Sequence, residues 1–207
     1  MKNSSRFHLI LLVGFLIALG LSAIKPHDYF TWILEVFPAI IGVGILAFIY
    51  NRFRFTNLVY FLIFIHCLIL IVGGHYTYAE VPLFNWLRDV LHSGRNNYDK
   101  VGHFAQGFIP AMISREVLIR NRVINGQSWQ FVLIVAICLS ISAFYEFIEW
   151  WVAILSGSAG DSFLGTQGYI WDTQSDMFLA FIGAILAQLF LTKFHNQQLQ
   201  QLENEKP

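Results

Sequence analysis

Long apolar runs, separated by short polar stretches, dominate the chain. They cover residues 7–24, 30–50, 57–73, 101–119, 129–155 and 172–194. About 20 consecutive apolar residues are needed for an α-helix to cross the hydrocarbon core of a bilayer. The pattern therefore predicts an all-α, polytopic membrane protein that forms a single bundle of six transmembrane helices. Neither a linker nor a repeat interrupts the pattern, so we expect one integral membrane domain over residues 1–207.

The third connection, residues 74–100, is long enough to hold an element of its own. Leu83, Leu87, Val90 and Leu91 recur there at helical spacing, with Trp86 between them. An amphipathic helix of this kind lies along a membrane surface, and tryptophan is typical of the headgroup level. We therefore predict a short interfacial helix in the third loop.

Two of the runs carry polar or small residues on one helical face. The fourth run is the least hydrophobic, and its polar and small positions form one stripe: Asp99, His103, Gln106, Gly107, Pro110 and Ser114. The sixth begins with two acids and continues on the same face with small residues: Asp172, Asp176, Ala180, Gly183, Ala184 and Ala187. Small residues let helix backbones approach closely in a membrane. Both stripes are expected to face the interior of the bundle.

Basic residues alternate between the ends of the runs. They gather at the N-terminus, in the second and fourth loops and in the tail: Lys2, Arg6, Arg52, Arg54, Arg115, Arg120, Arg122 and Lys193. Lysine and arginine concentrate in the cytoplasmic loops of membrane proteins. The alternation predicts that both termini lie in the cytoplasm.

Composition narrows the classes of partner. Only 13% of the residues are charged and the formal net charge is zero, so nothing indicates a nucleic-acid partner, and the expected surroundings are membrane lipids. Cys67 and Cys138 both fall inside apolar runs, which argues against a disulfide framework or a thiolate metal site.

Acids and histidines recur at the ends of the runs predicted to face the outside. Asp99 and His103 stand four residues apart, so on a helix they share one face. Burying an ionised residue in a membrane costs about 2.5–3.5 kcal/mol or more at its centre, so such groups must pair, protonate or share a cation. Imidazole and carboxylate ligands without thiolates suit Zn, Mn, Fe or Mg. The predicted metal ligands are His75, Asp99, His103, Glu146, Asp172 and Asp176, with Glu149 as general base or further ligand.

Each of these residues also has a structural interpretation. Asp99 and Asp172 could cap helix N-termini, and Glu149 could reach interfacial water. His66, in mid-run, is typical of a packed core histidine, and Glu35 could pair with Lys25 or His27 at the surface.

Four motifs together resemble the YjdF family of bacterial inner-membrane proteins. They are His75-Tyr-Thr-Tyr-Ala-Glu-Val-Pro82, Tyr98-Asp-Lys-Val-Gly-His103-Phe, Tyr145-Glu-Phe-Ile-Glu149-Trp and Leu164-Gly-Thr-Gln-Gly-Tyr-Ile-Trp-Asp172-Thr-Gln-Ser-Asp176-Met. The aspartate–histidine pair of the second motif and Trp171-Asp172 before a Gly/Ala-rich run also resemble, more loosely, VanZ-like membrane proteins, which are linked to glycopeptide tolerance. The resemblance implies a place in the inner membrane and a role for these positions, and it implies no reaction.

Three hypotheses about function remain open at this point. The first is a divalent-metal-dependent membrane hydrolase or transferase that acts on a lipid or lipid-linked envelope substrate. The second is a structural or assembly protein whose polar cluster locks the bundle. The third is a proton- or cation-coupled transporter, against which the inner halves of the runs offer few polar groups besides Ser114 and Gln188.

Overall fold

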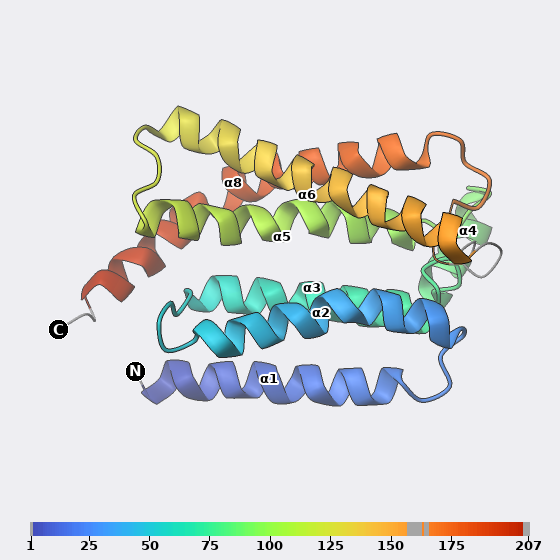
Figure 1. The fold of residues 1–207 in the computed structure, drawn as a ribbon, viewed down its shortest axis with the longest axis horizontal. Helices are drawn as coiled ribbons and strands as arrows, with labels where there is room; N and C mark the ends of the chain where they lie inside the picture. Colours follow the sequence, from blue (N-terminus) through green and yellow to red (C-terminus); the bar gives the residue numbers. More distant parts are fainter. Residues whose placement is uncertain (1, 157–162, 164–165, 205–207) are drawn as a thin grey trace.

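The computed structural model describes residues 2–156, 163 and 166–204, and these residues form seven helices without a strand (Figure 1). The helices are α1 (Lys2–Ser22), α2 (Tyr29–Ile49), α3 (Asn57–His75), α4 (Pro82–Leu91), α5 (Tyr98–Arg120), α6 (Gln127–Ser156) and α8 (Asp172–Asn204). Five of them, α1, α2, α3, α6 and α8, are long and apolar enough to cross a membrane. The prediction of an all-α, polytopic membrane protein is thereby confirmed.

The sixth predicted span corresponds to α5, which is 23 residues long but less apolar than the others. It packs against α3, α6 and α8, so neighbouring helices cover much of its surface. A helix enclosed in this way does not need an apolar residue at every position. The six-span count stays a prediction.

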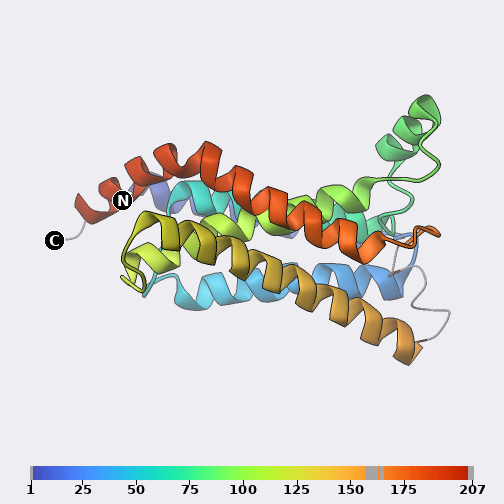
Figure 2. The same cartoon turned by 90° about the horizontal axis from the view of Figure 1, so that it is seen from above.

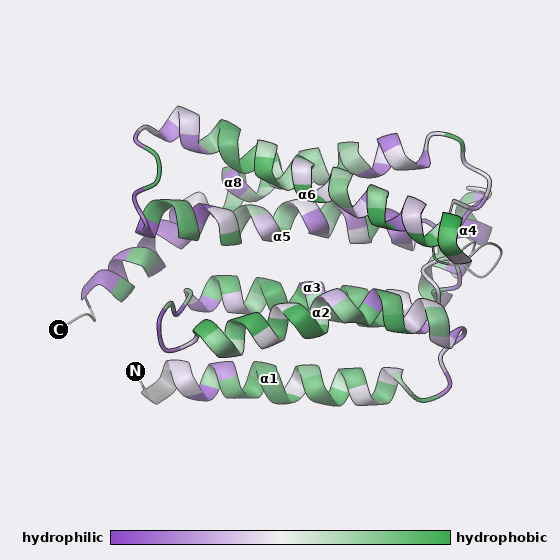
Figure 3. Ribbon diagram, viewed as in Figure 1, coloured by the Kyte–Doolittle hydropathy of each residue, from purple (hydrophilic) through white to green (hydrophobic). Residues whose placement is uncertain are grey.

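The long helices lie side by side, with α3 and α5 joining the two halves of the bundle (Figures 1 and 2). α3 packs against α1 and α2, whereas α5 packs against α6 and α8. The main core lies where these helices meet, around Val59, Met112, Ile134, Cys138 and Ala184, which are all fully buried. Figure 3 shows apolar residues along the lengths of the helices and more polar ones toward their ends.

The contact between α5 and α8 is the closest packing of backbones in the described bundle for which glycine is required. A Cβ atom at Gly107 would overlap the carbonyl oxygen of Ala180, and one at Gly183 would overlap that of Phe104. Ala184 and Ala187 continue the same seam and are fully buried. Small residues thus place the two backbones in direct contact, as the stripe on the sixth run predicts.

Short polar segments define where two of the helices begin. Asp28 caps α2, because its carboxylate accepts a 2.7 Å hydrogen bond from the Thr31 backbone N–H. That backbone hydrogen bond holds the pKa of Asp28 below its ordinary value. In α4, Pro82 occupies the first turn, where its missing N–H costs nothing. α4 stands away from the bundle in Figure 2 and exposes Trp86, in accord with the predicted short helix.

A largely buried polar network joins the C-terminal end of α5 to α8 and to the start of α3. Glu116 accepts hydrogen bonds from the backbone N–H and hydroxyl of Thr56, the latter at 2.8 Å, and from Arg120 at 2.7 Å. His195 Nε2 lies 3.0 Å from the same carboxylate, while its Nδ1 lies 2.9 Å from Arg115. Since a guanidinium only donates, Nδ1 accepts from Arg115 and Nε2–H donates to Glu116.

The same end of the bundle shows why α8 is longer than the predicted membrane span of residues 172–194. The helix continues to Asn204. Asn196 accepts a hydrogen bond from Arg115, and Gln198 accepts one from the Leu58 backbone N–H, so the extension docks on α5 and α3.

Candidate functional site

The predicted site residues belong to three helix ends that meet at one end of the bundle. α5 contributes Asp99 and His103 from its first two turns, and α8 contributes Asp172 and Asp176 from its first two turns. α6 contributes Glu146 about three turns before it ends. The carboxyl and imidazole groups of all five residues are largely buried, so each needs a partner inside the protein.

Two basic residues that we did not assign to the site carry most of its ion pairs. Lys100 Nζ lies 2.7 Å from Asp172 Oδ1 and 2.6 Å from Asp176 Oδ1. Arg95 Nη1 lies 2.7 Å from the same Asp172 oxygen, and its Nη2 lies 3.4 Å from Asp99 Oδ2. Asp172 is thus held by two cations. The sequence signal was present, since Arg95 and Lys100 flank Asp99 in a stretch where acids need compensation.

His103 lies at the centre of the cluster, with acids on both sides of its ring. Its Nε2 lies 3.2 Å from Asp99 Oδ1 and 3.8 Å from Asp176 Oδ2. Its Nδ1 lies 3.8 Å from Glu146 Oε1 and 3.3 Å from Gln106 Oε1. The imidazole therefore joins α5, α6 and α8 through side chains alone.

Among the residues that the structure describes, two groups of three are close enough to hold a metal ion, and His103 belongs to both. In each group one ligand atom from every member lies within 4.8 Å of the others. The first group is Asp99, His103 and Asp176, and the second is His103, Glu146 and Glu149. Glu146 Oε1 is buried and has no hydrogen-bond partner among the described residues. The second group therefore contains an unsatisfied acceptor that points toward an imidazole nitrogen.

A cavity of about 190 Å³ adjoins His103. Four helices, α2, α3, α5 and α6, and the segment between α3 and α4 contribute its polar walls. The polar residues are Glu35, His66, Tyr78, Asp99, His103, Gln106, Tyr145 and Glu149. Two of them, Glu35 and His66, are residues for which we gave a structural interpretation. The Tyr145 hydroxyl donates to Glu35 Oε2 at 3.3 Å, so Glu35 faces the bundle rather than a surface partner. No local sequence pattern predicts the contact between Tyr145 and Glu35, because only tertiary packing brings α6 near α2.

His75 is not brought into the cluster. Its Nδ1 lies 2.8 Å from the backbone oxygen of Ser22, and its own carbonyl accepts a hydrogen bond from the His27 N–H. It therefore ties the end of α3 to the connection between α1 and α2. The residues that the structure gathers from the predicted set are Asp99, His103, Glu146, Glu149, Asp172 and Asp176.

Acids outnumber cations in this part of the molecule. The described carboxylates are those of Glu35, Asp99, Glu146, Glu149, Asp172 and Asp176. The described cations that face them are Arg95, Lys100 and, when protonated, His103. Desolvated carboxylates in excess must protonate or share a cation. Arg95 and Lys100 pair with Asp99, Asp172 and Asp176, whereas Glu146 faces His103 Nδ1 at 3.8 Å.

Taken together, the helices and the buried acid–histidine cluster define an integral membrane protein with a polar site inside its bundle. The sequence of residues 7–197 matches the family described as "Predicted membrane protein (DUF2238)", and the chain belongs to that family. It is 48% identical over 197 residues to the Inner membrane protein YjdF of Escherichia coli (strain K12). The aligned region covers 95% of this chain and 91% of the relative. No solved structure matches the chain.

Proposed function

We propose that His103, Glu146 and Glu149 bind a divalent metal, and that the protein is a metal-dependent hydrolase or transferase of the bacterial inner membrane. The observation that carries this proposal is the 3.8 Å between His103 Nδ1 and the unsatisfied Glu146 Oε1. Metal–ligand bonds of about 2.0–2.2 Å put two ligands of one ion roughly 3–4 Å apart. The two atoms stand at that separation in a buried site.

The other side of the histidine ring supports the same assignment. Nε2 lies 3.2 Å from Asp99 Oδ1, so the ring proton on Nε2 can be donated to that carboxylate. This leaves the Nδ1 lone pair free for a metal, the arrangement in which a ligating histidine donates its other N–H to an acid. The Gln106 amide, 3.3 Å from Nδ1, can present its NH2 group to that nitrogen in the metal-free protein.

The position of Lys100 favours His103, Glu146 and Glu149 as the ligands over the group of Asp99, His103 and Asp176. Its ammonium lies 2.6 Å from Asp176 Oδ1, so an ion between Asp99, His103 and Asp176 would have to sit beside a resident cation. Like charges at that distance repel strongly in a buried site. Glu146 and Glu149 have no comparable basic partner among the described residues.

The neighbouring cavity gives such an ion somewhere to act. Three protein ligands leave a coordination position for water or substrate, and a bound metal polarises a phosphoryl or carbonyl oxygen there. Glu35 also lines the cavity and is a candidate proton acceptor, since Glu149 serves as a ligand. Apolar walls from Leu70 and Phe163 suit the junction between a lipid headgroup and its chains. The class of substrate we propose is therefore a lipid or lipid-linked envelope compound.

The test is metal analysis of purified wild-type protein by mass spectrometry, beside His103→Ala, Glu146→Gln and a matched control, His75→Ala. The control removes a histidine bonded only to backbone at Ser22. We expect a stoichiometric metal in wild type and control and a loss of metal from the two cluster variants, with all four still folded. Metal-free wild-type protein after reconstitution with Zn, Mn, Fe and Mg would overturn the proposal.

One observation favours a second candidate function, a structural lock. Arg95 and Lys100 already bind Asp99, Asp172 and Asp176, so part of the cluster fastens α8 to α5 without any ion. Deleting one member of a buried pair typically costs about 3–5 kcal/mol. A lock predicts that His103→Ala and Asp176→Asn both unfold in detergent and that a chelator does not change the wild-type melting temperature. The metal proposal predicts that both variants stay folded and that a chelator lowers the melting temperature of the wild-type protein.

A further inference from the structure

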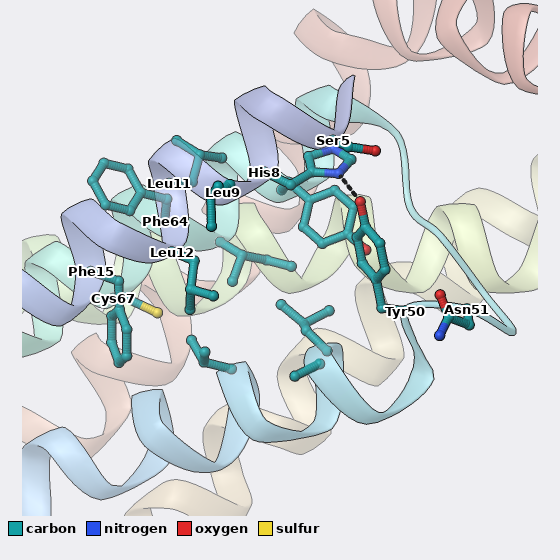
Figure 4. Close-up of a pocket in the computed structure, with 15 residues that line it drawn as sticks. Ser5, His8, Leu9, Leu11, Leu12, Phe15, Tyr50, Asn51, Phe64 and Cys67 are labelled. Carbon is teal, nitrogen blue, oxygen red and sulfur yellow. Dashed lines mark hydrogen bonds between the residues drawn. The ribbon is translucent and has the colours of Figure 1, made fainter. Parts of the chain in front are cut away.

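A second hollow lies at the opposite end of the bundle, between α1 and α2. Its volume is about 510 Å³, within the range of about 300–1,000 Å³ typical of ligand pockets. α3 packs against both α1 and α2 and forms the floor with Ile63, Phe64 and Cys67. Figure 4 shows Leu9, Leu12 and Phe15 of α1 along one wall. This groove belongs to no part of the acid–histidine cluster.

The groove is apolar along most of its length and polar at one end. Ser5, His8, Tyr50 and Asn51 gather at the polar end, and Phe15 and Cys67 lie at the other (Figure 4). Both ring nitrogens of His8 are engaged, Nδ1 with the Tyr50 hydroxyl at 2.9 Å and Nε2 with Asn57 Oδ1 at 2.8 Å. The polar end is therefore held in place before any ligand arrives.

The length of the groove corresponds to one leaflet of a bilayer. Ser5 and Phe15 are separated by ten residues of one helix, which rises about 15 Å over that distance. The hydrocarbon core of a bilayer is about 30 Å thick, so one leaflet contributes about 15 Å. An acyl chain of ordinary length would fill the groove from its polar end to its apolar end.

Arginine residues surround the polar end. Arg52 follows Asn51 directly and Arg54 comes two residues later, with its guanidinium 4.7 Å from the centroid of the Tyr50 ring. Arg6 follows Ser5 on α1 and is exposed. None of the described residues that line the groove is acidic. Charge complementarity therefore selects an anionic headgroup for whatever amphiphile occupies the groove.

From these observations we propose that the groove binds one anionic phospholipid. One acyl chain lies against α3 between α1 and α2, and the phosphate meets Arg52 and Arg54 beside Tyr50. The proposal does not depend on the metal site, which lies at the other end of the helices. Basic residues alone would attract anionic lipids without a groove. The proposed binding requires the apolar groove as well as the arginines.

The groove is tested by filling it. Ala47 is an exposed, small residue on the α2 wall, so Ala47→Trp places an indole in the groove, and Leu12→Trp does the same from α1. Ile45→Trp is the matched control, since Ile45 is an exposed residue of α2 that does not line the groove. Native mass spectrometry of the purified chain, titrated with phosphatidylglycerol or phosphatidylcholine, measures binding directly.

We expect at least tenfold tighter binding of phosphatidylglycerol than of phosphatidylcholine by wild type and Ile45→Trp. The preference and the tight binding should be lost from whichever of Ala47→Trp and Leu12→Trp retains the wild-type melting temperature. Arg54→Gln should weaken phosphatidylglycerol binding about fivefold, and Arg122→Gln, in a different loop, should leave it unchanged. Equal binding of the two lipids, or equal effects of Ala47→Trp and Ile45→Trp, would overturn the proposal.

Discussion

A single methyl group should have opposite effects at two glycines of this protein. At Gly107 a Cβ atom would fall far inside the 3.0 Å that real Cβ atoms keep from other atoms, and the obstacle is the Ala180 backbone. α5 and α8 would have to separate by roughly 1 Å, and overpacking of this kind costs about 1–3 kcal/mol. At Gly44 nothing lies within 4 Å, so alanine gains up to about 1 kcal/mol of helix propensity.

The two substitutions should therefore differ by about 2–4 kcal/mol, or roughly 5–15 °C in melting temperature for a protein of this size. The assay is thermal unfolding of Gly107→Ala and Gly44→Ala in one detergent. Separation at Gly107 would also lengthen the Lys100 contacts to α8, so metal binding should fall in that variant alone. Equal melting temperatures for the two variants would refute the close contact between α5 and α8.

Three further predictions concern other parts of the chain. Glu116→Ala should lower the free energy of unfolding by about 3–5 kcal/mol, because it leaves buried donors unpaired, whereas Glu203→Ala at an exposed site should not. Asp28→Ala should cost about 1 kcal/mol and Asp28→Asn little. Because its folded pKa is lowered, Asp28 stabilises above its ordinary pKa of 3.8, and the effect fades as the pH of an unfolding titration falls below it. Reporter fusions at Asn125 and after Gly168 should report opposite sides of the membrane, and the same side would refute the predicted topology.

Much of the fold could be predicted because bilayer thickness and helical period fix it. The apolar runs predicted the positions of the six long helices among the described residues. The small residues at Gly183 and Ala184 predicted the face of α8 that packs closely, which is the face that meets α5. Hydropathy could not predict how far α8 continues, because most residues after Phe194 are polar and two of them dock on α5 and α3 through hydrogen bonds. Hydropathy reports contact with lipid, and it carries no information on polar docking between helices.

The site could be predicted in part for a similar reason. Asp99 and His103 are local, since four residues make one helical turn, and their contact follows from sequence. The partnership of Glu35 with Tyr145 joins positions 110 apart and depends on how helices cross. Lys100 was not assigned to the site because the acids that it binds, Asp172 and Asp176, belong to α8. The predicted topology does not show that its side chain reaches them.

The network around Glu116 also has a consequence for biogenesis. During synthesis α5 emerges well before α8, so Arg115 lacks its His195 and Asn196 partners until the last helix has been made, although Thr56 and Arg120 are already available to Glu116. A weakly apolar segment with unpaired charges is retained poorly by lipid on its own. If α5 is the predicted sixth span, we expect its stable integration to depend on a helix encoded some fifty residues later in the chain. A nascent protein truncated before Asp172 should then leave α5 exposed to quality-control proteolysis.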